Sequence, residues 1–305
     1  MEEVLQRLRG PFLQQHTPEL VLELLEEAFH FIELRSGAAV RTEIRPRPAK
    51  GGIALLVNMP DQPFIVDTTR LFLRTRAAEF WGGFNVVVRV SRDAEGRMIG
   101  VGQPDGRSES IVLYEADTAD LGAPGAADTL RRNLEHAQAS VHDFDAMVQA
   151  VKAFAQRAEQ IAAQEPGRAD AARETAAFLS WLVADNFVLL GMDSNNTALG
   201  IQTLTSSPFI GSNAGEWPEP NFPGTVSVRK SALESPIHRS GRIDEILVRL
   251  DGVGELFIRG MFTYRAITLP SRHVPILRRM LADILAGQTA GPGSHRYKGL
   301  ANVFD

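Results

Sequence analysis

The residues with the greatest potential for chemistry lie in the run Ser235-Pro236-Ile237-His238-Arg239, which combines a hydroxyl, an imidazole and a guanidinium in one predicted turn before a strand. A serine nucleophile needs a histidine base, a group that orients the base and donors for the oxyanion. A serine and a histidine three residues apart supply neither of the last two. We therefore interpret Ser235, His238 and Arg239 as a structural turn or an interdomain contact. A hydrolase that uses Ser235 and His238 is the less favoured alternative.

Nucleotide and metal sites have recognisable spacings, and the sequence lacks them. Gly100-Val101-Gly102 and Gly252-Val253-Gly254 come nearest to the G-x-G-x-x-G turn, but neither has the third glycine and both stand between strand patterns. His136 and His142 are six residues apart on a predicted helix, so they point to different faces, and no HExxH motif occurs. We predict no catalytic residue, no cofactor-binding residue and no metal ligand in this chain.

Strand and helix patterns alternate in an order that predicts an α+β fold. The apolar run 53–57 is typical of a strand buried on both faces, the segment 58–63 reads as a turn, and 64–76 has helical spacing. Three β-prone runs follow, and the turn from Arg92 to Gly96 indicates a hairpin. Strand patterns return from Phe187 to Phe262, and the residues from Val274 to Ala286 form an amphipathic helix pattern.

The clearest periodicity runs from Leu130 to Ala162, where apolar residues recur in alternating steps of four and three. Such a seam needs a second helix beside it. Phe144 falls on this seam, so the neighbouring polar residues are expected to be solvated. Because Glu165-Pro166-Gly167 interrupts the pattern and 170–184 resumes it, we predict an antiparallel helical hairpin. An intermolecular coiled coil is the alternative.

These patterns divide the chain into four predicted segments, with the Pro-rich run Arg45-Pro46-Arg47-Pro48 as the first connector. The last pattern, from Ser294, resembles the start of a helix that is cut short at Asp305, which suggests a longer natural chain. The segments are an N-terminal helical segment (1–48), an α+β domain (49–125), the helical hairpin (126–185) and a second α+β domain with a truncated C-terminal helix (186–305).

Composition narrows the class of protein further. The chain has 305 residues and a net charge of −5, which argues against a general nucleic-acid binder because such proteins need a concentrated basic face. It contains no cysteine, so disulfides and thiolate metal sites are excluded. Neither a signal peptide nor a run of about 20 apolar residues is present, so we expect a cytoplasmic protein that does not enter the membrane.

Several motifs, in the right order, together resemble one family, the large bacterial NAD-dependent glutamate dehydrogenases. Each motif alone is weak, but together they cover the chain from about Gly52 to its C-terminus. The segments that carry the resemblance are NMPDQPFIVDT (58–68), FLSWL (178–182) with DNFVLLG (185–191), SPIHR (235–239), PILRR (275–279), and GSH (293–295) followed by Lys298.

The resemblance implies a fold and a division of labour. The N-terminal region of that family carries ACT-like α+β domains and helical connectors, and its glutamate- and NAD-binding catalytic domain lies far downstream. We therefore expect tandem ACT-like α/β sandwich units, each an antiparallel sheet with helices on one face, joined by the helical hairpin. Such enzymes oxidatively deaminate glutamate to 2-oxoglutarate and transfer hydride to NAD. None of their catalytic residues has a matching position in this chain.

The resemblance also implies a candidate effector site. ACT domains often bind amino acids at the turn after the first strand, frequently with a D-x-P-G motif. Here Asp61-Gln62-Pro63-Phe64 retains the aspartate and the proline, but Phe64 replaces the glycine that would let a small ligand approach the backbone. We expect Phe64 to fill that space or to point into the core. The candidate effector or interface residues are Asn58, Asp61, Gln62, Pro63, Phe64 and Asp67.

The leading hypothesis is a regulatory and oligomerisation module of a glutamate dehydrogenase that has no catalytic activity by itself. Its expected partners are other copies of the same region, the downstream catalytic region and a small amino-acid effector. NAD would be bound by the parent enzyme outside this segment. The alternative is a stand-alone ACT-type amino-acid sensor, which would bind a small amino acid saturably as an isolated chain.

Overall fold

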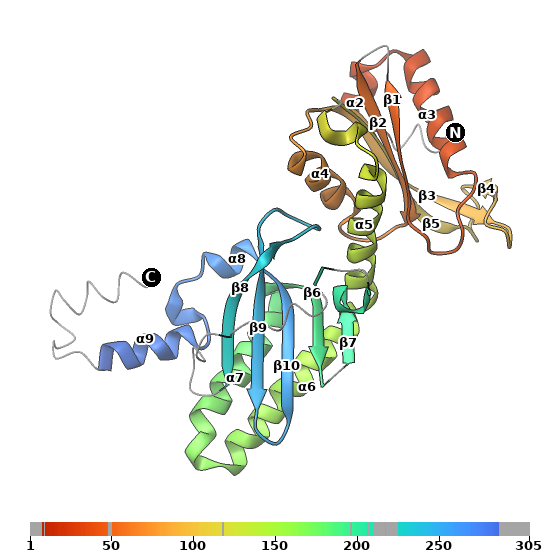
Figure 1. Cartoon of the computed structure of the whole chain (residues 1–305). Helices are drawn as coiled ribbons and strands as arrows, with labels where there is room; N and C mark the ends of the chain where they lie inside the picture. Colours follow the sequence, from red (N-terminus) through yellow and green to blue (C-terminus); the bar gives the residue numbers. More distant parts are fainter. Residues whose placement is uncertain are drawn as a thin grey trace. The chain divides into compact units, whose positions relative to one another are not determined.

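The computed structural model places the chain in two compact units, each built on a five-stranded sheet (Figure 1). It describes residues 8, 10–47, 51–117, 119–195, 197–205, 208–209, 217 and 225–286. The first unit comprises residues 1–138 together with Ser235–Ser240, and the second comprises 139–234 and 241–305. The predicted helix start at Ser294 lies outside the described residues. Within the described part of the chain, no helix combines the length and apolar character needed to cross a membrane.

The first sheet is antiparallel throughout and has the strand order β1-β2-β5-β3-β4. The turn from Arg92 to Gly96 joins β3 to β4, which confirms the predicted hairpin. The elements of this part of the chain are α2 (Gly10–Gln15), α3 (Pro18–Ile32), β1 (Arg41–Arg47), β2 (Gly52–Pro60), α4 (Ile65–Thr75), β3 (Phe80–Arg92), β4 (Met98–Val101), β5 (Arg107–Asp117), η1 (Ala119–Gly122) and α5 (Ala126–His142).

Helices cover both faces of the first sheet, whereas we expected them on one face only. Successive residues of a strand point to opposite faces. Leu56 packs in a core with Phe31 of α3, and Leu55 packs in a second core with Phe72 of α4 and Leu130 of α5. The predicted burial of the 53–57 strand on both faces is confirmed, and it is the reason that a second helical layer is required. The N-terminal helices, expected as a separate segment, supply that layer.

The run Arg45-Pro46-Arg47, predicted to be a connector, belongs to strand β1. β1 pairs with β2 alone, and Pro46 lies opposite Ile53. A proline lacks the N–H needed to bridge two neighbours, but it is tolerated in an edge strand, which hydrogen-bonds on one side only. The proline signal therefore marks the edge of the sheet and not a break in it.

The continuous seam predicted from Leu130 to Ala162 is divided between two helices and two cores. α5 ends at His142 and α6 begins at Phe144, whose side chain is exposed and does not face a seam. Leu130 belongs to a core of the first unit, while Val151 belongs to the core of the second. Asp143 marks the break and is not simply solvated, because its Oδ2 accepts a hydrogen bond of 2.7 Å from the backbone N–H of Gly200.

The second sheet is also antiparallel, with the order β7-β6-β10-β9-β8. Its core brings α6 and α7 against apolar residues of β6, β8, β9 and β10. The elements of this part are α6 (Phe144–Gln164), η2 (Pro166–Arg168), α7 (Ala169–Trp181), η3 (Leu182–Asn186), β6 (Phe187–Ser194), β7 (Thr197–Gly200), η4 (Ile201–Thr203), β8 (Val226–Glu234), β9 (Arg242–Leu250), β10 (Gly254–Phe262), α8 (Tyr264–Ile267), η5 (Ser271–His273) and α9 (Leu277–Ala286).

The exposed residue Ala77, just after α4, has a left-handed backbone with φ +51°. This conformation closes the helix, because the N–H of Ala78 donates to the carbonyl of Leu73 at 3.1 Å. Glycine adopts it without the steric cost of a Cβ. Ala77→Gly is therefore expected to raise the free energy of unfolding of the first unit by about 1 kcal/mol. The same change at Ala153, exposed within α6, is expected to lower stability by about 1 kcal/mol. Urea denaturation of both variants measures the two shifts, and shifts of the same sign would contradict the assignment.

Candidate functional site

The predicted turn begins later than expected, because Asn58 lies inside β2 and is fully buried. Its side chain shares a face of the sheet with Leu56 and reaches Glu109 on β5, where Nδ2 donates to Oε2 at 2.9 Å. Asp61 follows the strand and is exposed, and its Oδ1 accepts a hydrogen bond of 2.6 Å from the Ser110 hydroxyl. The structure therefore assigns Asn58 to a polar cluster in the sheet and Asp61 to the turn.

Phe64 occupies the position at which the D-x-P-G motif has glycine, and it keeps the glycine-like backbone. Its φ is +73° and its ψ is 0°, and it immediately precedes α4. The side chain is half-buried, and its ring meets the ring of His238 edge-on with 5.2 Å between the centroids. The aromatic contact stabilises a conformation that is otherwise unfavourable for a bulky residue.

Residues Ser235–Ser240 belong to the first unit, where His238 lies beside the start of α4. The backbone N–H of His238 donates to the Thr68 hydroxyl at 3.4 Å, and its Nδ1 lies 3.9 Å from a carboxylate oxygen of Asp67. Burial lowers the pKa of His238 below its ordinary value, and it outweighs the opposing effect of Asp67. The structure thus brings Phe64, Asp67 and His238 together. It also leaves two buried polar atoms near this turn without a hydrogen bond, His238 Nδ1 and Gln62 Nε2.

The hydroxyl of Ser235 closes a local turn. It donates to the carbonyl of Ile237 at 2.7 Å and accepts from the N–H of the same residue at 3.3 Å. The N–H of Arg239 also donates to that carbonyl, at 2.9 Å. Such side-chain to backbone bonds are typical of serine in turns. They engage the hydroxyl locally, which favours the structural interpretation over a nucleophile.

A buried ionic cluster that sequence reasoning missed lies on the α3 face of the first sheet. Glu109 of β5 accepts hydrogen bonds from Arg35, after α3, at 2.6 Å and from Arg92 of β3 at 2.8 Å on each oxygen. With the bond from Asn58, both carboxylate oxygens are fully used, and Glu109 and Arg35 are at most 5% exposed. Arg35 and Glu109 are 74 residues apart, so no local pattern announces the pair.

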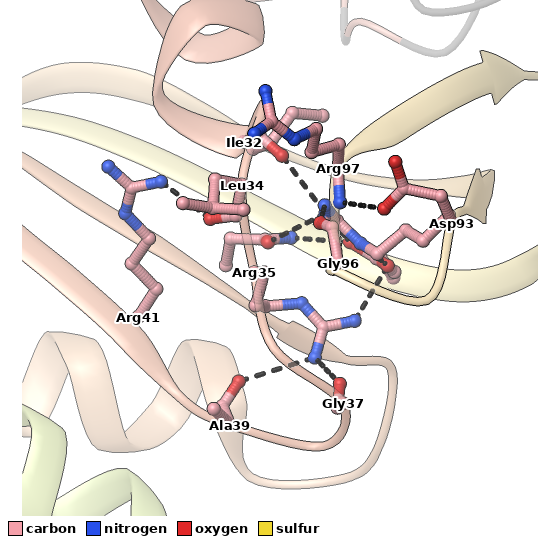
Figure 2. Close-up of polar contacts among 12 residues, drawn as sticks. Ile32, Leu34, Arg35, Gly37, Ala39, Arg41, Asp93, Gly96 and Arg97 are labelled. Carbon is pink, nitrogen blue, oxygen red and sulfur yellow. Dashed lines mark hydrogen bonds and ion pairs between the residues drawn. The ribbon is translucent and has the colours of Figure 1, made fainter.

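The cluster fixes the loop after α3 to the β3–β4 hairpin. Figure 2 shows Arg35 extending to the carbonyls of Gly37 and Ala39, and the Arg35 N–H donates to the carbonyl of Gly96 at 3.0 Å. Gly96 has φ +83°, and a Cβ there would overlap the backbone of Arg35, so only glycine permits this approach. A pocket of about 390 Å³ adjoins the cluster and is lined by residues of the same loop and hairpin, together with Asp105 and Arg107.

The charge of Glu109 makes the first unit sensitive to acid. Burial raises the pKa of Glu109, but the hydrogen bonds from Arg92, Arg35 and Asn58 outweigh burial and hold the pKa below its ordinary value. A lowered folded pKa stabilises the unit above the unfolded pKa, about 4.3, and that stabilisation is lost as the pH falls through the folded value. The stability difference between wild type and Glu109→Gln is therefore expected to shrink below about pH 4. Urea unfolding from about pH 7 to about pH 3 measures the difference, and a gap that stays constant would exclude this role.

The second unit has a similar ionic cluster, which lies on the face of its sheet that the helices α6 and α7 do not cover. Arg229 of β8 and Arg259 of β10 both lie in register with Glu245 of β9. Their Nε atoms donate to the two carboxylate oxygens at 2.8 Å and 3.0 Å. Arg259 has no exposed surface and also donates to the side chain of Gln202 at 2.9 Å. Across the described residues, no group of three histidine or carboxylate side chains is arranged to hold a metal ion.

Comparison with known proteins places the chain in a family. Residues 3–134 match the glutamate dehydrogenase ACT1 domain. The chain is 30% identical over 283 residues to an NAD-specific glutamate dehydrogenase of Halomonas elongata, a match that covers 80% of this chain. It is 24% identical over 283 residues to the protein of that name from Pseudomonas aeruginosa, which covers 83% of this chain. The chain spans 17% of the length of each relative. The antiparallel α+β architecture agrees with an ACT-like domain, and the chain belongs to the NAD-specific glutamate dehydrogenase family, within the part that carries the ACT1 domain.

Proposed function

We propose that this chain is a non-catalytic regulatory segment of an NAD-dependent glutamate dehydrogenase. The observation that carries the proposal is the match to the ACT1 domain and to two NAD-specific glutamate dehydrogenases over most of the chain. The parent enzyme would deaminate L-glutamate oxidatively to 2-oxoglutarate with NAD as the hydride acceptor. This segment would take no part in the hydride transfer itself.

The topology of the described sheets supports this division of labour. Dinucleotide-binding folds bind the cofactor at the carboxyl ends of parallel strands that helices connect. Every strand pair described in both units is antiparallel. The NAD and glutamate sites would therefore lie in the downstream catalytic region of the parent chain. The second unit would be a further ACT-like unit, and α6 and α7 would be the helical hairpin that precedes its sheet.

Assembly is the second part of the proposal, and exposed apolar side chains of the second unit support it. Tyr264 and Ile267 of α8 are 80% and 65% exposed, and Leu277 of α9 is 44% exposed. Ile267 and Leu277 line an apolar pocket of about 420 Å³ that Phe178 and Trp181 also line. Such a patch is characteristic of protein interfaces. We propose that it contacts another copy of the chain or the catalytic region of the parent enzyme.

Two measurements on the purified chain test this function. With glutamate and NAD, the chain is expected to produce no NADH, and turnover would overturn the non-catalytic assignment. In sedimentation equilibrium, Ile267→Glu is expected to weaken self-association by about tenfold or more, because it places a charge in the apolar patch. Phe144→Glu is the matched control, because Phe144 is an exposed apolar residue outside that patch. If the wild-type chain is monomeric, or both variants behave alike, the patch is not a contact between copies.

A stand-alone amino-acid sensor is the second candidate function. The two hydrogen-bonding atoms left unused near the start of α4, Gln62 Nε2 and His238 Nδ1, favour it. A small amino acid could satisfy a donor and an acceptor there. Calorimetric titration with common amino acids tests the idea. Saturable binding that Asp61→Ala abolishes would support a sensor, and no binding to any of them would exclude it.

A further inference from the structure

We propose that residues 274–286, which comprise α9 and the turn before it, form a lid over the apolar pocket of the second unit, and that Glu174 of α7 holds the lid closed. Residues 274–277 form one wall of this pocket, and Phe178 and Trp181 of α7 form another. The lid would control access to a surface that is part of the proposed assembly contact, so its use in assembly rests on the proposed function.

Glu174 holds the start of the lid with both of its carboxylate oxygens. Oε1 accepts the backbone N–H of Ile276 at 2.8 Å and the Nε–H of Arg278 at 2.7 Å, and Oε2 accepts from Nη2 of Arg278 at 2.9 Å. Two such bonds from one guanidinium form a bidentate pair, the strong form of this contact. Burial raises the pKa of Glu174, but the hydrogen bonds from Arg278 and Ile276 outweigh burial and hold the pKa below its ordinary value.

The turn that Glu174 holds is strained. Ile276 has φ +70°, in the left-handed region that is unfavourable for a β-branched residue. A strained backbone persists only where the surrounding contacts enforce it. The contacts here are the bond to Glu174 and the burial of the Ile276 side chain, which is 4% exposed in the core of the second unit. Loss of the first contact therefore favours a turn with an ordinary backbone.

The rest of the lid buries little apolar surface. Leu281 of α9 is buried, whereas Leu277 and Ile284 are 44% and 39% exposed. Segments with few buried apolar contacts open locally at a lower free energy than the centre of a sheet. The bonds from Glu174 are thus a large part of what keeps 274–286 in place.

Labelling of a single thiol in the pocket wall measures how often the lid opens. The chain contains no cysteine, and Val226, which lines the pocket from β8, has no exposed surface. In the full chain, the thiol of Val226→Cys is expected to react with iodoacetamide when the lid opens. Addition of Glu174→Gln, which keeps the size of the side chain and removes its charge, is expected to raise the rate about tenfold, the value of one charge-assisted hydrogen bond. An unchanged rate overturns the role of Glu174.

Two controls separate opening of the lid from general loosening of the unit. Ile258→Cys places the thiol in the core of the same sheet, outside the pocket lining, and Glu174→Gln is expected to change its rate by less than about twofold. Equal acceleration of the two thiols overturns the lid.

The second control, Glu159→Gln, makes the same change at an exposed position of α6 and is expected to leave the rate of Val226→Cys within about twofold. An acceleration as large as that from Glu174→Gln overturns the proposal. Self-association of Ile267→Glu is a separate measurement, so failure of the lid and failure of the assembly contact are recognised independently.

Discussion

Glu109→Gln is expected to lower the free energy of unfolding of the first unit by about 3–5 kcal/mol at neutral pH. The substitution keeps the size of the side chain, so it creates no cavity. It removes the carboxylate that the guanidiniums of Arg35 and Arg92 share, and the buried Arg35 and the largely buried Arg92 would both lose that counter-charge. The loss is larger than that of a surface ion pair, which is worth at most about 1 kcal/mol, because water cannot screen or solvate the remaining charges.

The chain is divided into two compact units, so the readout must report on the first alone. Trp81 is the tryptophan of the first unit, and Trp181 and Trp217 belong to the second. Urea denaturation followed by Trp81 fluorescence in a Trp181→Phe/Trp217→Phe background therefore isolates the effect. Asp105→Asn removes an exposed carboxylate nearby and is expected to change stability by less than about 0.5 kcal/mol. Similar losses in the two variants would show that Glu109 contributes no more than a surface charge.

Glu245→Leu is expected to destabilise the second unit by about 3–5 kcal/mol, for the same physical reason. Arg229 and Arg259 flank Glu245 in register across three strands, and Arg259 has no exposed surface. Without the carboxylate, the Arg259 guanidinium would stay buried beside the neutral side chain of Gln202 and would lose the counter-charge of Glu245. The cost thus arises from the charge left behind rather than from the contact removed.

A second substitution distinguishes these two origins. The double variant Glu245→Leu/Arg259→Met also removes the buried Arg259 guanidinium. It is therefore expected to be about 1–3 kcal/mol more stable than Glu245→Leu alone. Urea unfolding followed by Trp217 fluorescence, in a background without Trp81 and Trp181, measures both variants. Arg229 lies 3.9 Å over the Trp217 ring, so this probe reports on the cluster directly. The single variant Arg259→Met completes the comparison. If the double variant loses as much free energy of unfolding as the two single variants together, the explanation by an unpaired buried charge is wrong.

The candidate sites show where sequence reasoning stops. The sequence drew attention to the turn after β2 and to 235–239 separately, and only the fold places Phe64, Asp67 and His238 in contact. The roles of these residues remain predictions. Glu109 was missed altogether, because its partners come from other parts of the chain and its own neighbours read as an ordinary strand end.

The sequence by itself determined the α+β class, the hairpin after β3 and the strand buried on both faces, because hydrophobic period and turn residues are local signals. It also carried the family resemblance, since that rests on short motifs in order. The tertiary structure decided the rest. Only neighbours distant in sequence reveal that Pro46 lies in an edge strand, that the helical seam serves two cores, and that Arg35 and Arg92 share Glu109. Burial and charge pairing are properties of the assembled fold, and no local pattern specifies which distant residue supplies the partner.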